Sequence, residues 1–97
     1  MTRIYIAGPM SGLPELNYPA FHRAAEGLRA LGYEVENPAE NPEPPCKSWA
    51  GYMRMSVAQV ARCDEVHFLR GWSQSRGARL ERQIAESLGL LLSGAAS

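Results

Sequence analysis

The sequence has few of the residues that bind metals, form disulfides or cross membranes. Its 97 residues include two cysteines and two histidines, Cys46, Cys63, His22 and His67. The cysteines form no CxxC pair, and with two histidines they assemble no zinc site at standard spacings. A run of about 18 apolar residues, the length that a membrane-spanning helix needs, is missing. We therefore expect no metal, no cofactor and no membrane contact.

An excess of charge of either sign is missing as well. Ten Lys and Arg residues balance ten Asp and Glu residues, so the formal net charge is zero. Proteins that bind nucleic acid polymers draw most of their affinity from an excess of cationic groups. The composition therefore argues against a nucleic acid polymer as partner, while it leaves room for a nucleotide as a small ligand.

The amino-terminal segment lacks the long apolar stretch of a signal peptide. We therefore expect a cytoplasmic protein with reduced thiols, in which a Cys46–Cys63 disulfide is possible but disfavoured. Hydrophobic residues make up 45% and charged residues 21% of the chain, as in ordinary globular proteins. The length fits one domain over residues 1–97.

The order of the predicted elements is that of a small α/β domain. Short β-branched or aromatic runs predict strands, and apolar residues spaced three and four apart predict amphipathic helices. Strands are expected at residues 3–7, 33–36, 65–69 and 90–92, helices at 19–31, 48–62 and 77–88, and a frayed tail at 93–97. Strand, helix and strand within about 35 residues form a βαβ unit. We expect a three-layer α/β fold with a parallel sheet of about four to five strands.

The loops that follow the strands are the expected binding site, because open parallel sheets bind ligands beyond the carboxyl ends of their strands. These loops begin at Gly8, Asn37 and Gly71 and are rich in Gly, Pro, Asn, Ser or Trp, as a nucleotide-sized pocket requires. Backbone N–H groups and a hydroxyl in the first loop could hold a phosphate or a sugar hydroxyl. The candidate binding residues here are Gly8, Pro9, Met10, Ser11, Gly12, Asn37 and Pro38.

Glu81 is the first candidate for a catalytic residue. On a helical wheel it lies about 100° from Leu80, between Ile84 at about 40° and Ala85 at about 140°. One carboxylate therefore points to the interior from the first turn of the last predicted helix. A partly desolvated carboxylate in a pocket is a candidate nucleophile or base. The alternative is a buried glutamate that pairs with Arg or Tyr for structural reasons alone.

Five other side chains have a functional and a structural interpretation. Tyr5 could orient the Glu81 carboxylate or be a core tyrosine with any acceptor. Ser75 could contact phosphate or simply cap the last helix. Ser56, on the inward arc of its helix, could face the pocket or bond the carbonyl four residues back. Trp72, like Trp49, could stack on a base or pack in the core.

Several segments together resemble the nucleoside 2-deoxyribosyltransferase-like superfamily. They are Ile4–Gly12 (IYIAGPMSG), Gly32–Glu40 (GYEVENPAE), Cys63–Val66 (CDEV) and Gly71–Glu81 (GWSQSRGARLE). Within that superfamily, the chain is most similar to a short branch of undefined function that is often found in phages and prophages. The resemblance covers nearly the whole chain and implies a flavodoxin-like, Rossmann-like fold.

The resemblance also implies a reaction and the residues that carry it. Characterised members cleave or exchange the N-glycosidic bond of 2′-deoxynucleosides or their 5′-monophosphates through a glutamate in a Gly-x-x-x-Glu motif. Gly77 and Glu81 match that motif, which implies that Glu81 is the nucleophile. Tyr5 matches the family tyrosine of the first strand, and Ser75 matches a serine that contacts phosphate in the monophosphate-specific relatives.

One position departs from the family pattern. Ser56 replaces an aspartate that is thought to assist proton transfer to the leaving base. Because a lost general acid costs about 10²–10⁴ in rate, the main expectation is an N-glycosidase or deoxyribosyltransferase-like enzyme, and the alternative is a non-catalytic nucleotide-binding module. A third interpretation is a small assembly protein. The expected partners are a small deoxynucleoside or deoxynucleotide and a second copy of the chain in a homodimer.

Overall fold

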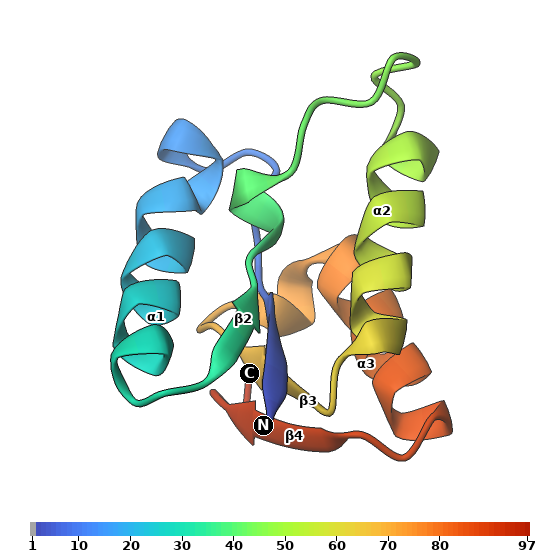
Figure 1. Ribbon diagram of the computed structural model, residues 1–97. Coiled ribbons are helices and arrows are strands. Elements are labelled where there is room, and N and C mark those ends of the chain that lie inside the picture. Colours follow the sequence, from blue (N-terminus) through green and yellow to red (C-terminus); the bar gives the residue numbers. More distant parts are fainter. Residues whose placement is uncertain (1) are drawn as a thin grey trace.

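The computed structural model, which describes residues 2–97, is a parallel four-stranded sheet covered by helices on both faces (Figure 1). The strands are β1 (Arg3–Ala7), β2 (Glu34–Glu36), β3 (Glu65–Phe68) and β4 (Leu91–Gly94), in the order β2-β1-β3-β4. The helices are α1 (Tyr18–Ala30), α2 (Trp49–Arg62) and α3 (Arg76–Ser87). Short 3-10 turns lie at η1 (Pro14–Asn17), η2 (Pro38–Glu40) and η3 (Trp72–Gln74). The predicted α/β class and parallel sheet are confirmed.

The two faces of the sheet have separate apolar cores, and β1 contributes to both. Ile6 packs on α1 with Phe21 and Ala25. On the opposite face, where α2 and α3 lie, Tyr5 packs with Val60 and other buried residues. This alternation is the period-2 pattern of a central strand. It directs the phenol of Tyr5 toward α2 and α3.

Capping side chains begin the two helices on that second face. The Ser48 hydroxyl accepts from Gly51 N at 3.0 Å and starts α2, as its position in the sequence predicted. The Ser75 hydroxyl accepts from Ala78 N at 3.2 Å and starts α3. These bonds satisfy backbone donors that would otherwise lack partners in a first helical turn.

The carboxyl-terminal segment differs from the prediction of a frayed tail. Ser93 and Gly94 belong to β4 and pair with His67 and Phe68 of β3. At Gly94 φ is +92°, and an added Cβ would lie 2.3 Å from the Phe68 carbonyl oxygen, so glycine is required there. Farther along, the Ser97 carbonyl accepts from Gly71 N at 3.1 Å. Contacts with residues that are distant in sequence therefore hold this segment in place.

No helix between residues 2 and 97 has the length and apolar character to cross a membrane. In the same range, no three His, Cys, Asp or Glu side chains come together in a way that could hold a metal ion. Cys46 is exposed, Cys63 is buried, and both are free thiols.

Candidate functional site

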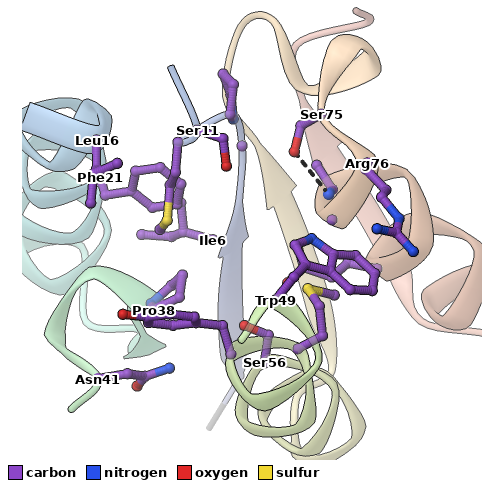
Figure 2. A pocket seen from close by; sticks show the side chains of 18 of the residues that line it. Ile6, Ser11, Leu16, Phe21, Pro38, Asn41, Trp49, Ser56, Ser75 and Arg76 are labelled. Carbon is purple, nitrogen blue, oxygen red and sulfur yellow. Dashed lines mark hydrogen bonds between the residues drawn. The ribbon is translucent and has the colours of Figure 1, made fainter. Parts of the chain in front are cut away.

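A pocket of about 530 Å³ lies beyond the carboxyl end of β1. Its walls come from the first loop, the α1 side of the fold, η2, and the beginnings of α2 and α3. Figure 2 shows Leu16 and Phe21 on one side of this space and Trp49 and Arg76 on the other. The volume falls within the range of about 300–1,000 Å³ that is typical of small-molecule sites.

Most of the site residues expected from the sequence line this one pocket. They are Tyr5, Gly8, Pro9, Met10, Ser11, Pro38, Ser56, Ser75, Gly77 and Glu81. They come from four separate segments that the parallel sheet brings to one edge, which is where sheets of this topology bind ligands.

Two loop residues from the same prediction lie outside the lining. Gly12 is exposed in a turn with φ of +79°. Asn37 is 2% exposed, and its side chain accepts from Ala39 N at 3.1 Å and lies 3.3 Å from His22 Nδ1. The amide of Asn37 therefore starts η2 instead of facing the cavity.

Trp72 is also outside the lining, as a core residue. It is 7% exposed, and its ring centroid lies 4.9 Å from that of Phe68. Its indole Nε1 donates to the Ala95 carbonyl at 2.9 Å. Of the two sequence-based interpretations, packing is the one that the structure favours, and Trp49 rather than Trp72 lines the pocket.

Glu81 reaches the pocket from the buried side of α3. The buried positions of that helix are Ala78, Glu81 and Ala85, and Glu81 is 5% exposed. The phenol of Tyr5 donates a hydrogen bond of 2.6 Å to its Oε2 atom. No Lys or Arg of residues 2–97 forms a salt bridge with this carboxylate, so Tyr5, not a cation, holds it.

Burial raises the pKa of Glu81 from 4.5 to about 7, because the charged form loses its water. Hydrogen bonds from Tyr5 and Ser56 act in the opposite direction and lower that pKa. The pKa of Tyr5 lies well above 10, first because of burial and then because of the charge of Glu81. Near neutral pH, a substantial fraction of Glu81 is therefore an anion whose Tyr5 partner keeps its proton.

Ser56 lies beside this pair. It is 8% exposed and lines the pocket from α2, and Figure 2 shows its hydroxyl directed to the cavity. Because its hydrogen bonding lowers the pKa of both Glu81 and Tyr5, it belongs to the polar group around the carboxylate. Of the two alternatives for Ser56, the pocket-facing one is observed.

The beginning of α3 forms a polar part of the wall. Ser75 accepts from Ala78 N (dashed in Figure 2), which leaves its own hydroxyl proton free to donate. Arg76 is adjacent, and its guanidinium carbon lies 3.7 Å from the ring centroid of Trp49. A helix start with a free hydroxyl donor and a neighbouring cation suits an anionic group.

Gly77 has a packing role at the junction of α2 and α3. A Cβ at this position would lie 3.2 Å from Met53 Sδ, which is closer than most real contacts. Glycine therefore lets α3 approach α2 one turn before Glu81. Gly77 thus allows close packing of the two helices, and one turn later Glu81 directs its carboxylate inward.

Several lining residues were missed as site residues by the sequence analysis. The aromatic and amide side chains among them are Tyr18, Asn41, Tyr52 and Gln74. Tyr52 is 40% exposed, and its place on the apolar arc of α2 resembled core packing. Large aromatics at the first turn of a helix that follows a proline-rich loop were the available signal.

Comparisons with known proteins identify a family and a similar fold. Residues 2–93 match the family described as Domain of unknown function (DUF4406). The solved structure of a 2-desoxiribosyltransferase from Leishmania mexicana aligns with a TM-score of 0.73 at 18% identity, over 97% of this chain and 63% of that chain. This chain thus spans less than two thirds of the length of that structure, and the likeness shows the fold. No curated protein matches the sequence.

The superfamily resemblance seen in the sequence is therefore confirmed at the level of the fold, while the phage or prophage branch stays a prediction. The chain belongs to the DUF4406 family, and its α/β architecture is the flavodoxin-like fold of a deoxyribosyltransferase.

Proposed function

We propose that this protein breaks the N-glycosidic bond of a 2′-deoxynucleoside or its 5′-monophosphate, with Glu81 as nucleophile. The observation that carries the proposal is the buried Glu81 carboxylate, which faces a pocket of about 530 Å³ and is held by a 2.6 Å hydrogen bond from Tyr5. The deoxyribosyltransferase fold of the similar structure supports the same chemistry.

The proposed reaction begins when a Glu81 oxygen attacks the anomeric carbon of the sugar. The bond between that carbon and the base nitrogen breaks through a transition state with oxocarbenium character, as in glycoside hydrolysis. A carboxylate at short range stabilises this positive charge and then forms a covalent sugar ester. Water completes a hydrolysis, or a second base completes a transfer.

Tyr5 and Ser56 act in this proposal by positioning Glu81. The phenol occupies Oε2 of the carboxylate, which leaves the other oxygen, Oε1, for attack. Both hydroxyls lower the pKa of Glu81 and thus raise the fraction of reactive anion near neutral pH. Neither needs to lose a proton for this role.

The beginning of α3 is the proposed contact for a 5′-phosphate. Ser75 has a free hydroxyl proton, and Arg76 adds a positive charge beside it on the pocket wall. Backbone N–H groups at a helix start favour a phosphate as well. The glycine-containing loop from Gly8 to Ser11 is the proposed contact for the sugar.

Two further expectations accompany this proposal. The free thiols of Cys46 and Cys63 suit a reducing compartment such as the cytoplasm. A homodimer is expected because a chain of 97 residues has a high ratio of surface to core. Size-exclusion chromatography with light scattering measures that state directly.

The test is release of free base from the four common deoxynucleosides and their 5′-monophosphates, followed by chromatography. Glu81→Gln is expected to reduce release about 10³-fold or more. Glu86→Gln is the matched control, because Glu86 is exposed on the same helix and its carboxylate pairs with Arg82 at 3.1 Å. Release that survives in Glu81→Gln would refute the nucleophile. Binding without release would support a nucleotide-binding module instead.

A further inference from the structure

The pocket contains a single carboxyl group. Among its lining residues in the described part of the chain, Glu81 is the sole Asp or Glu, and none is a histidine. The remaining ionisable side chains of the lining are the phenols of Tyr5, Tyr18 and Tyr52 and the guanidinium of Arg76. A guanidinium keeps its proton at any physiological pH, so the cation is not an acid here.

The hydroxyl groups beside Glu81 are poor proton donors for a leaving base. The Tyr5 proton lies in the 2.6 Å bond to Oε2, and both burial and the charge of Glu81 raise the pKa of that phenol well above 10. Ser56 lines the pocket beside this pair and lowers the pKa of both groups, and an alcohol is a far weaker acid than a carboxyl group. Neither hydroxyl is suited to give a proton to a departing base.

This inventory differs from that of ordinary glycosidases. They use two carboxyl groups, one at the anomeric carbon and one as the acid that protonates the leaving group. In this pocket, the proposed nucleophile accounts for the only carboxyl among the lining residues that the structure describes. A positioned general acid is worth about 10²–10⁴ in rate, and that assistance is missing for any base that must be protonated to leave.

Building on the proposed function, we infer that the substrates of this pocket are 2′-deoxynucleosides whose base departs as an anion, without a proton from the protein. In the first step, a bond forms between Glu81 Oε1 and the anomeric carbon, the carbon–nitrogen bond breaks, and its electron pair goes to the base nitrogen. Solvent protonates the free base later. Water then attacks the anomeric carbon, the electron pair of the ester bond returns to Glu81, and the water proton leaves to solvent.

The substrate class follows from this step. Electron-withdrawing groups on a pyrimidine stabilise its anion, so 5-nitro- and 5-halo-2′-deoxyuridine are good substrates and thymidine is a poor one. The aromatic pair Trp49 and Tyr52 on the pocket wall offers planar faces to such a ring. Unassisted departure places nearly a full negative charge on the base in the transition state, and the rate therefore depends steeply on the acidity of the base.

The experiment measures kcat/KM for a series of 5-substituted 2′-deoxyuridines at one pH, from nitro through halogen and hydrogen to methyl. This parameter reports the step that releases the base, even if hydrolysis of the ester limits turnover. The expected result is a fall of about tenfold for each unit of increase in the pKa of the base, because Brønsted behaviour is steep when no acid assists. A slope close to zero would overturn the inference and leave the proposed function intact.

The two phenols not bonded to Glu81 provide the second arm. Tyr18→Phe and Tyr52→Phe are expected to leave the slope of the series unchanged. If either variant lost activity selectively toward thymidine, that tyrosine would be the acid, and the inference would be wrong. Failure of the proposed function would give a different result. In that case, even 5-nitro-2′-deoxyuridine would show no release of base that depends on Glu81.

Discussion

The two faces of the sheet differ in what they bury. On the α1 face, the interior is apolar, with Ile6, Phe21 and Ala25 at its centre. On the α2 and α3 face, the interior includes Glu81 and Ser56, at 5% and 8% exposure. One central strand supplies both, since Ile6 points to one face and Tyr5 to the other.

The α1 face stabilises the fold, whereas the α2 and α3 face contains a buried carboxyl that destabilises it at neutral pH. Apolar burial on the α1 face lowers the free energy of the folded state in proportion to the area removed from water. Burial of Glu81 raises it at neutral pH, because the pKa of this carboxyl moves from 4.5 to about 7. A site that holds a poorly solvated anion gains reactivity at a cost in stability.

The largest expected effect is a loss of stability when a buried side chain on the α1 face is shortened. Ile4 is 1% exposed, and by strand alternation it shares the face of Ile6. Ile4→Ala is expected to lower the free energy of unfolding by about 2–5 kcal/mol in urea titrations. Base release per folded molecule should be unchanged. Leu31→Ala, at a side chain 75% exposed, is the control and should cost less than about 0.5 kcal/mol.

The second effect is the pH dependence of stability that the buried Glu81 carboxyl of α3 causes. The raised pKa of Glu81 means that stability is fully present below pH 4.5 and is lost as pH rises through about 7. Glu81→Gln removes this loss, so it should exceed the wild type by up to about 3 kcal/mol near pH 8 and match it near pH 4. Denaturant titrations at both pH values measure the difference. An equal change in Glu86→Gln would show that surface charge is the cause.

A smaller effect concerns the partner of Glu81. Tyr5→Phe removes a hydrogen bond that lowers the pKa of the carboxyl. The rise of kcat/KM with pH, expected in the wild type at about pH 7, should move to higher pH, with about tenfold less activity at neutral pH. A loss of equal size at every pH would instead show that Tyr5 serves only the packing of the site.

The smallest effect concerns the pocket rim. Arg76 stacks on Trp49 and is exposed, so its charge is screened by water. Arg76→Ala is expected to raise KM for a deoxynucleoside 5′-monophosphate by about threefold to tenfold. The KM for the corresponding nucleoside should stay the same. Equal changes for both substrates would argue against a phosphate contact.

Much of the fold could be predicted from local pattern. The spacing of apolar residues and the capping serine located α2 at Trp49–Arg62 almost to the residue, and the other elements within a few residues. The segment after Ser93 could not be predicted this way. Its order depends on pairing with β3 and on the bond from Trp72 to Ala95, and these partners are distant in sequence.

The candidate site divides along the same line. The inward direction of Glu81 follows from helix periodicity alone, whereas its contact with Tyr5 joins residues 76 positions apart. Leu88, the last residue of the predicted helix, is 54% exposed because α3 ends just before it. The side chains of Asn37 and Trp72 bond backbone groups instead of facing the cavity. Local pattern shows toward which face of a helix or strand a side chain points. Only the folded structure shows which of these side chains meet.

Trapping the sugar on Glu81 tests the proposed covalent step directly. The wild type is mixed with 5-nitro-2′-deoxyuridine, quenched in acid, digested and examined by mass spectrometry. We expect a deoxyribosyl adduct on the peptide that contains Glu81, and no adduct in Glu81→Gln. Base release without any adduct at Glu81, or an adduct on another residue, would contradict it.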